Sequence, residues 1–397
     1  MMANKYKIIF VFSIILEMVI SSCKKPNEST PSATFLKEFG NWTSPFFIES
    51  IVETTDQGYL MVGNNTNQTP VMIRVKKDGN LAWSKTMTND TFLASYVTPA
   101  GNGTYVMNCL YKYQISKVDT MGNLLSSDQY FNFIDNYFGL SPAISSSNGY
   151  IISSTNGWHQ GGTSINYIIL FDKTPNYVDT IRIADYPTLV GKTLTFNVYQ
   201  EGPSNSYYVY GQKLTKKLWS WNDNIYLYAA KVAPHKGWLI NVIDGTDESS
   251  TFSAIAKVTT SDSGLVLLAQ RINYAGNNSS AFVVSLDKNL KINWQNNYLE
   301  SGSTINPSSI SPCSDGGYII SGKDSIGTNS TKPFAVKIDK NGNQQWSKIY
   351  TFPGSGQFNS GIELSEGGYI FAGSTVGFGN GKSNQTLLLK TDANGNY

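Results

Sequence analysis

An all-β fold is predicted for this chain of 397 residues by three features of its sequence. The composition is rich in turn formers and poor in charge, with 35 glycines and only 15% charged residues. Short apolar runs recur with Asn, Ser and Gly between them, and no long stretch has the 3.6-residue period of a helix. One phrase also repeats at intervals of about fifty residues, a period typical of propeller blades.

The repeated phrase is a turn followed by a strand. Its clearest copies are "DGGYIISG" (315–322), "EGGYIFAG" (366–373) and "DQGYLMVG" (56–63). Taking the residue after the turn as an anchor gives these positions, spaced 45 to 58 residues apart: Tyr59, Tyr105, Tyr150, Tyr207, Leu265, Tyr318 and Tyr369. A second phrase, as in "VKIDKNGNQQW" (336–346), follows the anchor and is weakest in the fourth unit. Each unit therefore predicts four short antiparallel strands.

The last unit stops early, at "DANGNY" (392–397), without the strand that follows "DKNGN" in the copy before it. The missing strand is expected in "ATFLKEFGN" (33–41), which aligns with the end of a unit. Residues 34–39 would then complete the last blade and cover its free edge. The predicted fold is a seven-bladed β-propeller over residues 34–397, closed by an N-terminal strand completing the last blade. Six or eight blades are the alternatives.

These units resemble those of bacterial propeller lipoproteins built from "GGYIxxG…VKIDxNGNxxW" repeats. "KIDKNGNQQW" (337–346) is also distantly similar to the blade motif of quinoprotein dehydrogenases, in which a Trp docks one blade on the next. Trp83, Trp294 and Trp346 match that docking position, whereas the alanine and the Thr-Gly pair of the motif are absent. The resemblance implies a fold, and a fold does not imply a function.

Residues 1–22 have the layout of a secretory signal, with a basic head and an apolar run over 8–20 that is too short to span a bilayer. "ISSC", ending at Cys23, resembles a bacterial lipobox. That resemblance implies a signal peptide over 1–22, an acylated Cys23 and a polar tether through residue 33. Glu17 departs from the pattern, and a simple secreted leader is the alternative. Lys24, where an Asp would resemble an inner-membrane retention signal, favours the outer membrane, facing either the periplasm or the surface.

The charge balance excludes one class of partner. The formal net charge is +2, and without residues 1–22 it becomes +1, from 28 Lys and Arg against 27 Asp and Glu. This gives no electrostatic footprint for nucleic acid and no polybasic membrane patch. We expect no nucleic-acid partner, a membrane contact through the lipid at Cys23, and a monomer.

No catalytic, cofactor or metal motif stands out, so we expect no cofactor and no metal site. "DKNGN" (339–343) offers oxygen ligands for calcium, but the twelfth position of an EF-hand loop would be Tyr350 instead of Glu. Asn-Gly is moreover a strong hairpin-turn signal. His159 and His235, the two histidines of the chain, have no adjacent carboxylate motif. Cys109 and Cys313 fall in units that are not neighbours, so we expect free thiols that pack as small apolar groups.

The loops between the second and third strands are predicted to be long and different in each unit, which favours them as the binding face. The candidate loops are 155–166, 212–224, 270–280, 323–333 and 374–385. Aromatic side chains that could stack on a sugar or anchor a protein occur there: Trp158, Trp219, Trp221, Tyr274 and Phe378. The alternative for Trp219 and Trp221 is that they merely cover an enlarged fourth blade.

Three functions follow from these features. The first is a non-catalytic, lipid-anchored envelope protein that binds a glycan, peptide or partner protein. The second is an enzyme, either a polysaccharide lyase or hydrolase or a quinoprotein-like oxidoreductase, although Glu53 and Glu363 on first strands have no consistent partner. The third is a structural subunit of an outer-membrane assembly, which predicts an exposed apolar patch on one blade rim.

Overall fold

The structure is a computed structural model. It describes residues 33–39, 46–67, 69–87, 94–109, 114–129, 137–140, 144–146, 149–156, 165–171, 177–182, 193–202, 206–215, 224–233, 236–243, 250–259, 264–273, 278–299, 304–326, 330–376 and 385–397. Residues 34–397 form a compact unit, separate from residues 1–33. Every regular element in these described ranges is a β-strand, as the composition predicts. The described residues contain no helix that is long and apolar enough to cross a membrane.

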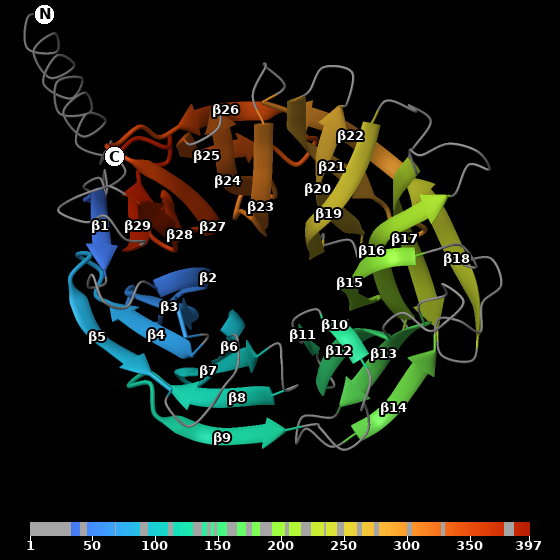
Figure 1. The fold of residues 1–397 in the computed structure, drawn as a ribbon, viewed down its shortest axis with the longest axis horizontal. Coiled ribbons are helices and arrows are strands. Elements are labelled where there is room, and N and C mark those ends of the chain that lie inside the picture. Colours follow the sequence, from blue (N-terminus) through green and yellow to red (C-terminus); the bar gives the residue numbers. More distant parts are fainter. Residues whose placement is uncertain are drawn as a thin grey trace, which may run out of the picture. The chain divides into compact units, whose positions relative to one another are not determined.

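The first half of this unit forms antiparallel sheets in chain order (Figure 1). The first sheet contains β2 (Phe46–Glu53), β3 (Tyr59–Asn65), β4 (Pro70–Val75) and β5 (Leu81–Thr86), and the second contains β6 (Ala94–Gly101), β7 (Thr104–Cys109), β8 (Gln114–Asp119) and β9 (Leu124–Gln129). In the third, β10 (Tyr137–Leu140) and β11 (Ile144–Ser146) both pair with β12 (Gly149–Asn156), followed by β13 (Ile165–Phe171) and β14 (Tyr177–Arg182). The fourth contains β15 (Thr193–Gly202), β16 (Ser206–Thr215), β17 (Asn224–Ala233) and β18 (Lys236–Ile243).

The next sheet has eight strands but consists of two four-stranded meanders. They are β19 (Ser250–Thr259), β20 (Leu265–Asn273), β21 (Asn278–Leu286) and β22 (Ile292–Tyr298), then β23 (Thr304–Pro312), β24 (Tyr318–Ile326), β25 (Ser330–Ile338) and β26 (Gln344–Ile349). The two meanders are joined by a parallel pairing at one position, Ser279 with Thr304.

The last sheet combines the two ends of the unit. β27 (Ser355–Glu363), β28 (Tyr369–Val376) and β29 (Gln385–Thr391) are completed by β1 (Phe35–Phe39), which pairs antiparallel with β29. The register runs from Phe35 opposite Lys390 to Phe39 opposite Thr386. Figure 1 shows the blue β1 beside the red β29. The predicted pairing of residues 34–39 with the last unit is therefore present.

The core lies between successive sheets. Strands such as β4 and β29 are buried along their whole length, because each face packs on a neighbouring sheet. Ile48 and Ile73 of the first sheet pack with Ile370 of the last. Outer strands such as β5 alternate between exposed and half-buried residues. The third strand of the repeat is apolar because it lies between neighbouring sheets, and the fourth is polar because it lies at the outside.

The anchors of the repeat occupy equivalent places. Each of them is the first or second residue of the strand after the innermost one, from Tyr59 in β3 to Tyr369 in β28. The innermost strand carries a one-residue bulge in the pairing, for example between Ile48 and Ser50 and between Phe358 and Ser360. Bulges sharpen the local twist of a strand. The repeat therefore specifies a twisted meander and not a flat sheet.

The last glycine of the "GYIxxG" phrase is required by this bulge. A Cβ at Gly322 would overlap the backbone oxygen of Asn306, and one at Gly373 would overlap that of Gln357. Both oxygens belong to the innermost strand just before its bulge. Only glycine fits there, because the two backbones approach too closely for any side chain.

A buried ion pair explains the first half of the same phrase. Lys337 on β25 is 3% exposed, and its Nζ lies 2.7 Å from Oδ2 of Asp315 in the turn before β24. Arg74 pairs with Asp56, and Lys390 with Glu366, in the same way. The second glycine of the turn leaves room for the cation, since a Cβ at Gly317 would lie 2.6 Å from Lys337 Nζ. The acid before "GY" and the cation in "VKID" thus form one ion pair.

Among the described residues, aromatic side chains join the outer strands β5, β22, β26 and β1 to the next sheet. Trp294 Nε1 donates to the carbonyl oxygen of Lys340 at 3.0 Å, and its ring lies against Gly342. Trp346 makes the same contacts with Ala393 and Gly395, and Trp83 lies against Gly122. The predicted docking role of these three tryptophans is confirmed. Phe35 of β1 takes the equivalent place and lies against Gly79 of the first sheet.

The Lys337–Asp315 ion pair predicts which of two variants loses more stability. Asp315→Ala leaves the buried Lys337 ammonium without its carboxylate, which we expect to cost about 3 kcal/mol of unfolding free energy. Lys337→Met keeps the volume and leaves Asp315, which is 44% exposed, to be solvated. We expect that variant to lose about 1 kcal/mol or less. Urea unfolding of residues 34–397 measures both values. Equal losses, or a larger loss for Lys337→Met, would contradict this assignment.

Candidate functional site

The residues predicted to bind or be modified lie outside the described part of the chain. They are Trp158, Trp219, Trp221, Tyr274, Phe378 and Cys23, and the same holds for His159 and His235. In sequence, each of the five aromatic residues falls between the second and third strands of a sheet, such as Tyr274 between β20 and β21. Their binding role therefore stays a prediction, and the described strand ends next to them carry the site geometry.

Two of the predicted loops are shorter than expected. β20 continues to Asn273 and β21 begins at Asn278, so most of 270–280 is strand. Likewise β24 and β25 pair up to Ile326 and Ser330, within the predicted loop 323–333. The prediction of long loops was wrong at these two places. Their polar residues suggested loops, but backbone pairing continues where the strand ends project beyond the apolar core.

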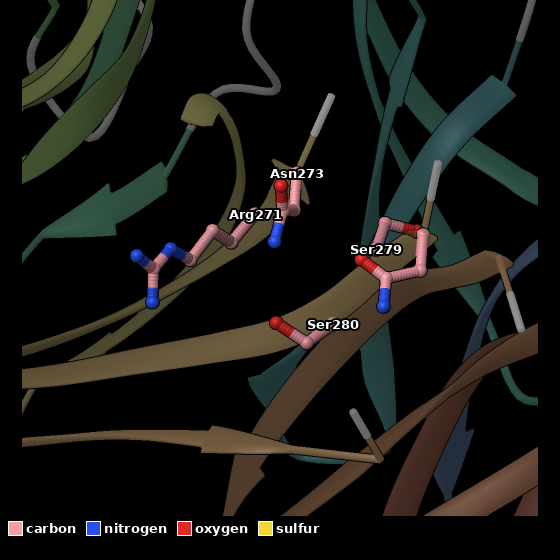
Figure 2. A pocket seen from close by; sticks show the side chains of 5 residues that line it. Arg271, Asn273, Ser279 and Ser280 are labelled. Carbon is pink, nitrogen blue, oxygen red and sulfur yellow. The ribbon is translucent and has the colours of Figure 1, made fainter. Parts of the chain in front are cut away.

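A cavity of about 220 Å³ lies at the end of the β20–β21 hairpin. It is lined by Arg271, Asn273, Asn278, Ser279 and Ser280. Figure 2 shows Arg271 and Asn273 on β20 and Ser279 and Ser280 on the neighbouring β21. The hairpin end is the one where Tyr274 follows Asn273 in the sequence. The cavity is smaller than the roughly 300–1,000 Å³ of drug-sized ligand sites, so it fits one sugar residue or one side chain.

Hydrogen bonds fix the wall of the cavity on the side of β23. Ser279 Oγ donates to the Ile305 carbonyl at 2.7 Å. Gln270 Nε2 donates to the same carbonyl at 2.9 Å and to Asn306 Oδ1 at 2.9 Å. These contacts surround the Ser279–Thr304 pairing that joins the two meanders. The wall is therefore preorganised by a polar network between two units of the repeat.

The lining has a distinct chemistry. The described lining residues are one arginine, two asparagines and two serines, and none of these five side chains is a carboxylate. Arg supplies planar N–H donors, and amide groups both donate and accept. Such a set complements sugar hydroxyls and a carboxylate on the same ligand. The signal for this cavity in the sequence was weak, because Arg271 belongs to no motif.

The two glutamates considered for catalysis have structural partners. Glu53 accepts hydrogen bonds from the backbone N–H and the hydroxyl of Ser365, both at 2.8 Å. Glu363 Oε2 accepts from the Ser314 backbone N–H at 2.5 Å. Each carboxylate thus holds a turn of the adjacent sheet. This arrangement explains why no catalytic partner could be found for them.

The "DKNGN" turn is explained without a metal. Oδ1 of Asp339 accepts from the backbone N–H groups of Asn341 and Asn343, both at 2.8 Å, and Oδ2 accepts from the Asn343 side chain at 2.9 Å. The Asn343 amide and then these N–H groups lower the pKa of Asp339. Asp119 and Asp392 cap their turns in the same way. Within the described residues, no group of three potential ligands could hold a metal ion.

Comparison with known proteins gives a result for the fold alone. No family model and no curated protein matches the chain. A streptogramin B lyase structure matches with 11% identity and a TM-score of 0.55, over 90% of this chain and 98% of that one. Catalytically inactive virginiamycin B lyase from Staphylococcus aureus, solved with quinupristin, matches with 11% identity and a TM-score of 0.53, over 90% and 100%. The β-propeller domain of the Trilobed protease from Pyrococcus furiosus has 9% identity and a TM-score of 0.49, over 88% and 95%.

The fold is a β-propeller. Successive antiparallel meanders of four strands, and the likeness of most of the chain to the two lyase structures, support the repeat architecture that the sequence predicts. At 11% identity this likeness does not carry the lyases' chemistry to this chain.

Cys313 provides a test of the packing between two blades. It is a free thiol, 8% exposed, in the cluster formed by Ile319, Tyr350 and Phe371. Burial raises the pKa of Cys313 to about 12. At pH 8 the reactive thiolate should be about a thousandfold rarer than for an ordinary thiol. In residues 34–397 with Cys109→Ser, we expect a disulfide reagent to react slowly until urea unfolds the protein. Fast reaction of the folded protein would contradict this packing.

Proposed function

We propose that this chain is a lipid-anchored envelope protein whose seven-bladed, closed propeller binds an acidic glycan without catalysis. The observation that carries the proposal is the polar cavity at the end of the β20–β21 hairpin, whose described lining is one arginine, two asparagines and two serines. Tyr274 follows the cavity in sequence and supplies a ring for stacking on a sugar. The ligand would bind on the face of the loops that join second to third strands.

Seven blades are supported by the sheet order. Six sheets occur among the described residues, and the eight-stranded one divides into two meanders at the Ser279–Thr304 pairing. Closure is supported by contacts of the first sheet with the last. Asn359 Nδ2 donates to the Ile48 carbonyl at 2.7 Å, and Lys77 pairs with Glu366. The strand β1 adds its own contact through Phe35 and Gly79.

Lipid anchoring rests on the sequence around Cys23. A leader over residues 1–22, an acylated Cys23 and a tether through residue 33 would attach the propeller to the membrane. We place the protein at the outer membrane because Lys24 follows the cysteine. The propeller would need no membrane-spanning element of its own.

The anchor is tested by labelling. In cells fed a palmitate analogue, the full chain should incorporate label and partition with detergent, and Cys23→Ser should abolish both effects. Cys109→Ser serves as the matched control and should keep the label. Label that persists in Cys23→Ser would refute acylation at this residue.

Glycan binding is tested on an array with residues 34–397. We expect saturable binding to glycans that carry a carboxylate, lost in Arg271→Met because the guanidinium is removed. Lys291→Met removes an exposed cation of the same sheet at its opposite end and should leave binding unchanged. A double variant, Trp219→Ala with Trp221→Ala, tests the predicted aromatic contribution.

Other outcomes of that screen are informative. Binding to neutral glycans that survives Arg271→Met would remove the cavity from the proposal. No binding by folded protein would favour a protein partner, which a pull-down from envelope extracts would identify. The predicted enzyme and assembly-subunit alternatives stay predictions.

A further inference from the structure

The second sheet differs from its repeats at its outer turn. In the "xxGN" turns before outer strands, the residue that precedes glycine is Asp78, Asn341 or Asn394. The second sheet has Met121 at this place, and its side chain is 60% exposed. The turn hydrogen bonds are the same, since Gly122 N–H donates to the Asp119 carbonyl as Gly342 N–H does to that of Asp339. Local folding therefore gives no reason for an apolar residue here.

A second departure follows on the outer strand β9. Its second residue, Leu125, is 53% exposed, whereas Ala82, Asn293 and Gln345 occupy the equivalent place in β5, β22 and β26. Leu124 beside it is 48% exposed, and Leu81, the first residue of β5, is 49% exposed. We call Leu81, Met121, Leu124 and Leu125 the apolar rim.

The first two sheets, which carry the apolar rim, contact each other. The Trp83 ring of β5 lies against Gly122, next to Met121. Lys85 Nζ, also on β5, donates to Asn123 Oδ1 at 3.0 Å. The rim thus extends from the start of β5 over the turn that precedes β9. Clusters of exposed apolar side chains mark contact surfaces more often than single ones do.

The place where the chain enters the propeller indicates which surface lies within reach of the apolar rim. The described propeller begins with Phe35, whose ring lies 3.0 Å from the place of a Cβ on Gly79. Gly79 belongs to the turn that leads directly into Leu81. The tether from residue 24 to 33 spans at most about 35 Å when fully extended. An anchor at Cys23 would therefore keep this edge of the propeller within about 35 Å of the bilayer.

We propose that the apolar rim docks on the surface of the membrane that carries the lipid anchor. The proposal rests on the acylation of Cys23 in the proposed function. Lys76 and Lys117 are exposed nearby, but so is Asp78, so contact depends on the apolar side chains more than on lipid charge. The rim lies at the turn end of the strands, opposite to the end where the β20–β21 hairpin forms the cavity. Docking would thus point the cavity away from the membrane.

The test places a fluorophore on the rim. Residues 24–397, with an N-terminal hexahistidine in place of Cys23 and with Cys109→Ser, are attached to zwitterionic vesicles that contain a nickel-chelating lipid. An environment-sensitive fluorophore is coupled to Met121→Cys or, as a control with similar exposure, to Ile349→Cys on β26. Buried Cys313 should stay unlabelled. Vesicles with and without spin-labelled lipid report contact with the bilayer.

We expect a blue shift and quenching by spin-labelled lipid at position 121, and neither at position 349. Leu125→Asp should abolish both signals at 121 without releasing the protein from the vesicles. Equal signals at the two positions, or none at 121, would overturn the proposal. A blue shift at 121 without lipid quenching would overturn it in favour of a second protein copy on the rim. Because the tag supplies the anchor, failure here is distinct from failure of acylation at Cys23.

Discussion

The contact of an outer-strand aromatic ring with the turn glycine of the next sheet is the constraint on which the architecture depends. The outer strands β5, β22 and β26 are largely exposed or half-buried, and this contact adds an apolar link to the neighbouring sheet. Trp294 on Gly342 and Trp346 on Gly395 add a hydrogen bond from the indole to a turn carbonyl. A glycine is needed because a Cβ would lie 2.5 Å from the Trp294 ring, and because the turn has a positive φ of 81° there. Phe35 repeats the contact at the start of the domain, so the N-terminal strand acts as the outer strand of the last sheet.

Much of this fold could be predicted from the sequence because each repeat carries its own turn and strand signals. The anchors and the pairing of residues 34–39 followed from aligning the copies, and the docking tryptophans followed from the resemblance to the quinoprotein blade motif. The bulges could not be predicted, since no residue type marks them and they appear only as shifts in pairing. The buried ion pairs could have been found. An acid three residues before the anchor tyrosine and a cation on the following strand, at Arg74, Lys337 and Lys390, recur together in the chain.

The site was less accessible to sequence reasoning. Aromatic residues between strands attracted attention because they are rare and large, whereas the cavity is built from Arg, Asn and Ser, which are common at strand ends. Glu53 and Glu363 looked like candidate acids until their partners on the adjacent sheet, Ser365 and Ser314, were seen. Comparison between the copies of an internal repeat can reveal residues that belong to no motif. Met121 stands out only when its blade is compared with the copies, in which Asp78, Asn341 and Asn394 hold the same place.

Removal of the N-terminal strand tests most directly whether the chain is closed through β1. Urea unfolding would be compared between residues 34–397 and residues 40–397. Loss of β1 removes the β29 pairing, the Phe35–Gly79 contact and the cover of a sheet edge. We expect the shorter protein to unfold at a clearly lower urea concentration and to self-associate through its open edge. Unfolding at the same midpoint, with no self-association, would contradict closure by this strand.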